Sequence, residues 1–162
     1  MFRNTGGGFV SRVRIVLVAA SLMAVSACGG TDASSEAQLV DERAAQVMPF
    51  DLDKTTHTFE KLPTGGVQEV VAIDSGDSEQ VALVQQHLRE EAEMLRRGDY
   101  SDPAEIHGMD MPGLEELRAG YRDISVEYIE LGDGARLVYT TSDETLVEAL
   151  HAWFDRQTMD HS

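Results

Sequence analysis

Apolar residues recur every three or four positions in two segments of the chain, which is the spacing of a helix that packs one face on a core. The first predicted helix is capped by Ser78 and runs to about Arg97. The second is capped by Ser142 or Asp143 and runs to about Thr158. The apolar positions are Val81, Val84, Leu88, Ala92 and Leu95 in the first helix and Leu146, Val147, Leu150, Trp153 and Phe154, with Gln157 on the same arc, in the second.

Each predicted helix follows two segments that alternate or run apolar like β-strands. The predicted strands are residues 56–62, 67–74, 124–131 and 135–141. Turn residues join each pair, Pro63-Thr64-Gly65-Gly66 in the first and Gly132-Asp133-Gly134 in the second. The order ββα therefore occurs twice. It predicts an α+β fold with a duplicated ββα plan, a mostly antiparallel sheet and helices on one face.

The connection between the two halves predicts short helices. Asp102-Pro103 fits the N-cap and first residue of one helix, and residues 112–119 form another that Gly120 ends.

The stretch before the first strand predicts a tether and a boundary. We expect residues 28–47 to form the amino terminus and tether of the mature protein, with residues 36–47 either a short helix or part of that tether. Met48-Pro49-Phe50 marks the start of a single domain at residues 48–162.

The first 28 residues have a different pattern. Arg3, Arg12 and Arg14 are their only charged residues, and an uncharged apolar stretch follows at residues 15–25. This length suits the apolar region of a signal peptide, whereas a membrane-spanning helix needs about 20 residues. The small residues of Val25-Ser26-Ala27-Cys28 resemble the lipobox of bacterial lipoproteins.

The lipobox resemblance implies that residues 1–27 are a signal peptide removed before Cys28. It also implies that the Cys28 sulfur carries a diacylglyceryl group with palmitate-type acyl chains. Two or three acyl chains hold a protein on a bilayer stably, so we expect a lipid-anchored protein on the extracytoplasmic face of a cell membrane. An uncleaved signal anchor and ordinary secretory cleavage near Ala27 are the alternatives.

Acidic residues outnumber basic ones, 29 against 13, for a formal charge of −16. Without the three arginines of the predicted signal peptide, the formal charge is −19. This charge argues against binding to nucleic acid. It also repels anionic headgroups, so the lipid alone must supply the anchoring. A single cysteine excludes an internal disulfide.

Common catalytic motifs are absent from the sequence. It contains no G-x-S-x-G, no H-E-x-x-H and no phosphate loop, and residues 74–79 lack the spacing of a calcium loop. The adjacent carboxylates Glu90-Glu91 and Glu115-Glu116 point about 100° apart on a helix, so we expect them on solvated faces. An enzyme of unknown class is therefore the third hypothesis, behind two kinds of binding protein.

The first hypothesis is a metal-binding lipoprotein. His87 and His151 occupy similar places in the two predicted helices, and each precedes a carboxylate, Glu91 or Asp155, by one turn. Imidazole together with thioether suits a copper ion. The candidate ligands are His57, His87, His107, His151, His161, Met109 and Met111. Each also has an ordinary alternative as a packing residue.

The second hypothesis is a protein-interaction adaptor of the cell envelope that binds no metal. His151-Ala152-Trp153-Phe154, with Tyr121, Tyr128 and Tyr139, would line an apolar groove for a partner protein. The alternative is that these aromatic residues belong to the core.

Six short motifs resemble a family of small bacterial proteins over about residues 48–161. They are Met48–Asp53, Thr55–Phe59, Gly98–Pro103, Ile106–Gly108, Met111–Gly113 and His151–Phe154. Members of this family are often named aspartate carbamoyltransferase. Transcarbamylases hold carbamoyl phosphate with a Ser-Thr-Arg-Thr-Arg motif, which this sequence lacks. The resemblance therefore supports the domain boundaries and implies no activity.

Overall fold

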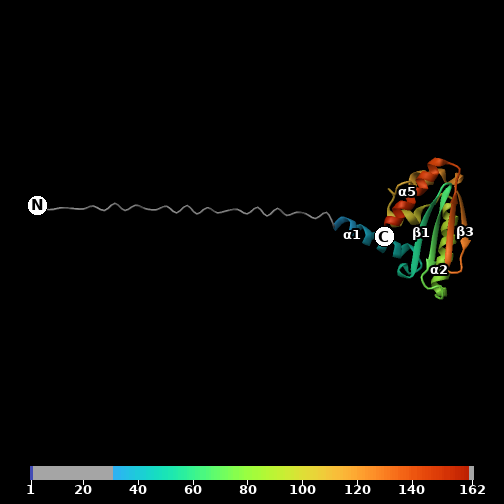
Figure 1. Cartoon of the computed structure of the whole chain (residues 1–162), viewed down its shortest axis with the longest axis horizontal. Coiled ribbons are helices and arrows are strands. Elements are labelled where there is room, and N and C mark those ends of the chain that lie inside the picture. Colours follow the sequence, from blue (N-terminus) through green and yellow to red (C-terminus); the bar gives the residue numbers. More distant parts are fainter. Residues whose placement is uncertain (2–30, 161–162) are drawn as a thin grey trace.

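The computed structural model describes Met1 and residues 31–160 (Figure 1). The predicted lipidation site Cys28, residues 2–27 of the predicted signal peptide and His161 lie outside the described residues. The helices are α1 (Thr31–Val47), α2 (Ser78–Leu95), α3 (Ser101–His107), α4 (Leu114–Gly120) and α5 (Glu144–Asp160), with 3-10 turns η1 (Leu52–Lys54) and η2 (Tyr121–Asp123). The strands are β1 (Thr55–Leu62), β2 (Gly65–Ala72), β3 (Ser125–Glu130) and β4 (Gly134–Thr140).

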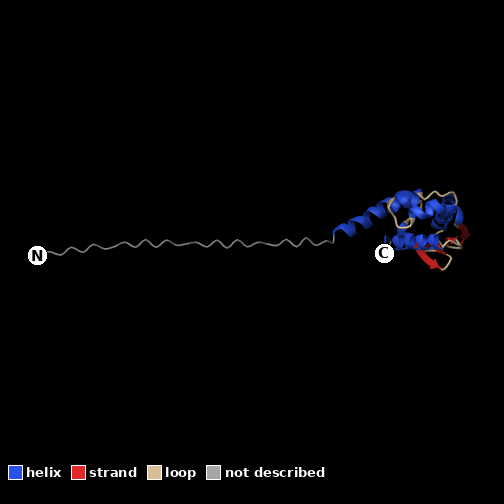
Figure 2. Ribbon diagram, turned by 90° about the horizontal axis from the view of Figure 1, so that it is seen from above, coloured by secondary structure: helices blue, strands red, loops and turns tan. Residues whose placement is uncertain are grey.

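The strands form one antiparallel sheet in the order β1-β2-β4-β3. Helices α2 and α5 pack on one face of the sheet, and Figure 2 shows the helical layer on one side of the strands. The predicted α+β fold with its two ββα units is therefore confirmed. None of the helices in residues 31–160 combines the length and the apolar composition of a membrane-spanning segment.

The two central strands are related by an approximate twofold axis. Each residue of β2 corresponds to the residue 69 positions later in β4. Gly65 pairs with Thr140 and Val71 pairs with Gly134, so exchanging the two strands gives the same register. Gly65 and Gly134 begin the two strands. A Cβ at Gly65 would lie 1.9 Å from the Tyr139 carbonyl oxygen, and one at Gly134 would lie 2.1 Å from that of Val70. Both ends of the central strand pair therefore need glycine for the same steric reason.

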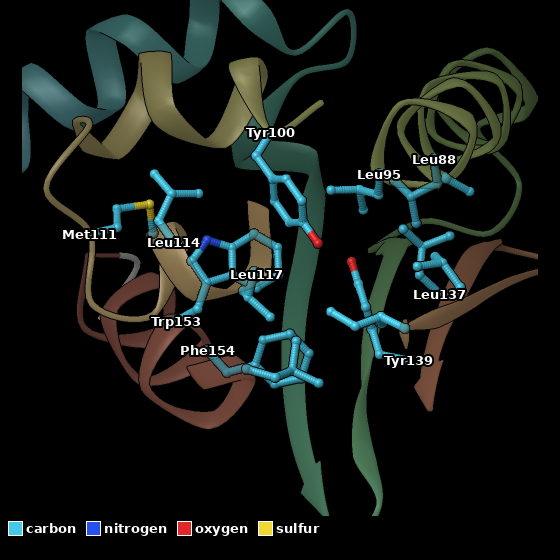
Figure 3. Packing of buried hydrophobic residues seen from close by; sticks show 14 of the residues in the cluster. Leu88, Leu95, Tyr100, Met111, Leu114, Leu117, Leu137, Tyr139, Trp153 and Phe154 are labelled. Atoms are coloured by element: carbon cyan, nitrogen blue, oxygen red, sulfur yellow. The ribbon is translucent and has the colours of Figure 1, made fainter. Parts of the chain in front are cut away.

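The main core lies between the sheet and the two long helices (Figure 3). All five predicted apolar positions of α2 are buried, as are Leu146, Leu150, Trp153 and Phe154 of α5. Figure 3 shows Trp153 and Phe154 beside Tyr139, and the Tyr139 ring centroid lies 6.1 Å and 5.6 Å from theirs. The aromatic residues of the last helix are thus core residues.

Aspartate side chains cap both long helices. The cap of α2 is Asp77, one residue before the predicted cap Ser78. Its carboxylate accepts a hydrogen bond from the Gln80 backbone N–H at 3.3 Å. The Asp143 carboxylate accepts one from the Thr145 backbone N–H at 2.8 Å, as predicted. Each aspartate satisfies backbone donors that the first helical turn leaves free.

The short helices differ slightly from the prediction. Helix α3 begins at Ser101, and its N-cap is Tyr100 rather than the predicted Asp102. Helix α4 begins two residues later than predicted, because Gly113 before it has a left-handed φ of 79°. A Cβ on Gly113 would lie 2.1 Å from the Ala149 carbonyl oxygen, so only glycine fits there.

Residues 36–47 adopt the helical alternative, and helix α1 begins earlier still, at Thr31. The part of the predicted tether that the structure describes is therefore helical. Val40 and Ala44 of α1 pack against Ile106 of α3 in a second hydrophobic cluster, separate from the main core. This cluster attaches α1 to the domain.

Candidate functional site

A narrow, partly open cavity of about 20 Å³ lies where α2, α3 and α5 meet β1 and β2. This volume holds about one water molecule or one small ion. Most of the side chains around it are polar, although it lies inside the domain. They are Met48, His57, Phe59, Gln68, His87, Glu91, Asp102, Pro103, Ile106, His107 and Gln157.

Helix α2 supplies a histidine and a carboxylate one turn apart. His87 is 7% exposed and Glu91 is 6% exposed. Desolvation lowers the pKa of His87, which the negative charge of Asp102 partly offsets. Desolvation also raises the pKa of Glu91 to about 7. Near neutral pH, the His87 imidazole is therefore held in its neutral, metal-binding form.

A hydrogen-bond chain from the core orients Glu91. The Tyr139 hydroxyl donates to the Gln68 side-chain oxygen at 2.7 Å. The Gln68 side-chain nitrogen in turn donates to the Glu91 carboxylate at 3.4 Å. Gln68 lies at the centre of β2, on the face that packs under the helices. The position of the Glu91 carboxylate is thus fixed through the most buried part of the sheet.

Phe50 places two imidazoles near each other. Its ring centroid lies 5.7 Å from that of His57 on β1 and 5.6 Å from that of His87 on α2. Within residues 31–160, His87 Nε2 is buried without a hydrogen-bond partner. Leaving such a polar atom unsatisfied costs about 1–3 kcal/mol. A ligand or water molecule in the cavity would remove that cost.

The outer wall of the cavity comes from α3 and the segment after α1. Helix α3 contributes Asp102 and His107, and His107 is 7% exposed. Met48, the first residue after α1, adds a thioether. At the far end of α5, Gln157 is buried, and its side-chain nitrogen has no hydrogen-bond partner among the described residues.

His151 does not belong to this group, contrary to the sequence prediction. Its Nε2 lies 3.0 Å from the Leu62 carbonyl oxygen and 2.9 Å from that of Gly65, so it donates to the β1–β2 turn. The two helices also begin in different registers. His87 comes ten residues after its cap Asp77, whereas His151 comes eight after Asp143. The two histidines are therefore not equivalent.

The structure also separates the two methionines predicted to be ligands from the cavity. Met109 is 67% exposed, and Met111 is buried in the main core. Neither lines the cavity, so neither can join the cavity histidines in this conformation. His57, His87 and His107 are the predicted ligands that the fold does bring to one place.

The sequence analysis gave Glu91 two alternatives, a solvated face or a place beside His87, and the structure buries it because the α2 stripe is broad enough to include it. Sequence reasoning did not predict Gln157, Gln68 or Met48 as site residues. Gln157 lay on the apolar arc of its helix, and Gln68 lies between Gly66 and Val70 on the buried face of β2, so both were polar residues in apolar positions. Met48 gave no signal beyond its position at the domain boundary.

The cavity combines imidazole, carboxylate and thioether groups in a desolvated space. Among the described residues, no three His, Cys, Asp or Glu side chains are already arranged to hold a metal ion. Ring rotation around the cavity would be needed to bring the imidazoles together. The fold is that of an acidic α+β domain, and no protein-family model, curated protein or solved structure matches the chain.

Proposed function

We propose that the chain is a membrane-anchored, extracytoplasmic lipoprotein whose acidic domain is a binding module. The lipobox at residues 25–28 and the charge of −19 after it support the location. The small polar cavity supports the binding of a single ion, because it is too small to hold an organic substrate.

The ligand is a single copper-like transition-metal ion. The observation that carries this proposal is that three imidazoles, His57, His87 and His107, line one cavity of single-ion size. Met48 supplies the soft thioether that the sequence suggested at Met109 and Met111. Neutral imidazole with thioether favours copper, including Cu(I), over the hard cations that prefer oxygen alone.

A copper titration of the full-length protein tests this proposal. Detergent-purified, chelator-treated protein is titrated under reducing conditions against a chromophoric Cu(I) competitor. We expect His87→Ala to lose more affinity than the roughly 10- to 100-fold that removing an outer-shell partner costs. His151→Ala, a histidine of the other long helix, is the control and keeps the wild-type affinity. Equal affinity in wild type and His87→Ala contradicts the metal proposal.

The lipid anchor has its own test. Metabolic labelling with radioactive palmitate should mark the wild-type protein and not Cys28→Ala, and the variant should leave the membrane fraction. A Cys28→Ala protein that still fractionates with membranes contradicts the anchor.

The adaptor hypothesis has less support in the last helix. Trp153, Phe154 and Tyr139 are each at most 1% exposed, so they form no surface groove. Tyr121 and Tyr128 pack at the edge of the same core. A partner protein would have to bind elsewhere on the domain.

A further inference from the structure

Helix α1 is attached to the domain through a cluster of its own. Val40 and Ala44 of α1 and Ile106 of α3 are 2%, 0% and 1% exposed, and they form a cluster separate from the main core. In Figures 1 and 2, α1 projects from one side of the domain. Only the partly buried Met48 and Leu52 pack against both clusters, so loss of the α1 attachment should leave the buried residues of the main core in place.

The α1 attachment reaches the cavity through two residues. The Met48 backbone N–H donates to the Ala44 carbonyl oxygen at 2.7 Å, which ties this cavity residue to the end of α1. Ile106 belongs both to the α1 cluster and to the cavity lining, and His107 follows it directly. Two groups proposed to hold the ligand, Met48 and His107, thus depend on the docking of α1.

Helix α3 has little to hold it by itself. It is seven residues long, and its N-cap Tyr100 makes no side-chain capping hydrogen bond. A helix this short is unstable in water without packing. Tyr100 and Ala104 pack it on the main core, and Ile106 packs it on α1. Release of α1 removes the packing at the cavity end of α3.

We propose that α1 is a strap that links the lipid anchor to the cavity: docked, it holds Met48 and α3 in place and closes the cavity, and released, it lets the cavity open. In sequence, α1 begins three residues after Cys28, so a pull or a steric block at the membrane acts on α1 almost directly. The effect on metal exchange rests on the proposed function. The opening of α3 does not.

Two substitutions on α1 test the strap. Ala44→Glu places a charge in the fully buried cluster, whereas Leu39→Glu places the same charge at a position that is 49% exposed on the same helix. Hydrogen exchange by mass spectrometry is measured on the detergent-purified full-length proteins, followed by the rate of Cu(I) transfer to a competitor. Ala44→Glu should speed exchange in α3 by about 100-fold, with α2 and the sheet unchanged, and should speed Cu(I) release. Leu39→Glu should match wild type.

The outcomes distinguish failure of the strap proposal from failure of the metal proposal. Unchanged exchange in α3 of Ala44→Glu contradicts the strap, and so does faster exchange in every element, since α1 would then belong to the main core. Val40→Ala only shortens an apolar side chain, so it must give a smaller increase in the hydrogen-exchange rate, confined to α1 and α3. Faster exchange in any other element of this variant overturns the proposal. If α3 opens as expected but wild type binds no copper, the strap stands and the metal proposal fails.

Discussion

Helices α2 and α5 carry the same pair of residue types at the same spacing, yet only one pair forms part of a site. On α2, His87 and Glu91 are both buried at the cavity. On α5, His151 bonds to the β1–β2 turn, and the side chain of Asp155 is 56% exposed, 2.6 Å from the Lys61 ammonium. A histidine followed by a carboxylate one turn later does not define a site. The packing around the pair decides its role.

The packing differs because the two pairs have different neighbours. On α5, Trp153 and Phe154 pack beside Tyr139 with their aromatic rings. Beside the α2 pair, the buried side chain of Gln68 on β2 is polar, and its amide donates to the Glu91 carboxylate. The aromatic region supports the fold, and the polar region leaves room for a ligand.

Removing the aromatic filling should have the largest effect. Trp153 is fully buried, so Trp153→Ala leaves a large void, and we expect a loss of about 3–5 kcal/mol in the free energy of unfolding. Urea unfolding followed by far-UV circular dichroism measures this loss. A loss below about 1 kcal/mol would mean that the aromatic region is not the main support of the fold.

Glu91→Gln should have the next largest effect, and it should depend on pH. The pKa of Glu91 is about 7 in the folded protein against 4.5 for an exposed glutamate, so the folded state holds a proton that the unfolded state releases. The contribution of Glu91 to wild-type stability is therefore largest at or below pH 4.5, and it is lost as the pH rises through 7. In metal-free protein, Glu91→Gln should be more stable than wild type by up to about 3 kcal/mol at pH 8.

Urea unfolding of metal-free wild type and Glu91→Gln across pH 5 to 8 measures this difference. The gap between the two proteins should widen with pH, because only the wild type carries the ionisable carboxyl. A constant gap over the whole range contradicts the burial of an ionisable Glu91.

His87→Leu should change the free energy of unfolding less than Glu91→Gln does. It should stabilise the metal-free protein and weaken Cu(I) binding. It removes a buried ring nitrogen that has no partner among the described residues, so metal-free protein should gain about 1 kcal/mol. Burial lowers the pKa of His87, so the wild type loses stability as the pH falls below the usual histidine range, and the variant does not share this loss. Thermal melts at pH 5 and 8, with and without Cu(I), test the effect of the variant on stability and its effect on metal binding. Stabilisation of the variant by Cu(I) as strong as that of wild type would contradict a ligand role.

Asp155→Asn should have the smallest effect. Its ion pair with Lys61 joins two exposed side chains, and such pairs contribute less than about 1 kcal/mol. It is the matched control for Glu91→Gln, since both changes convert the carboxylate that follows a histidine by one turn into an amide. A pH dependence as large as that of Glu91→Gln would mean that the two pairs do not differ as described.

The fold was predictable because its signals are local and repeated. The apolar stripe of α2 and the alternation of β4 follow directly from their periodicities, and the aspartate and serine residues before the two long helices mark their starts within a residue. The start of α1 was not predictable in this way. Its buried residues Val40 and Ala44 are few, and they are buried only because Ile106, far along the chain, lies opposite.

The candidate site was predictable only in part. His57, His87 and His107 were found by residue type, but local sequence did not separate them from His151, because the acceptors of His151 are carbonyl oxygens of a distant turn. The burial of Glu91 likewise depends on Gln68 and on α3, which come from other elements. Tertiary packing, and not spacing along one helix, selects the members of the cavity.

The most direct test of the cavity as a copper site is X-ray absorption spectroscopy of the Cu(I)-loaded full-length protein. Wild type should show nitrogen neighbours together with a sulfur neighbour. Met48→Leu should lose the sulfur neighbour and His87→Ala a nitrogen one, whereas Met109→Leu, at an exposed methionine, should match wild type. A copper environment unchanged in both Met48→Leu and His87→Ala would contradict the account.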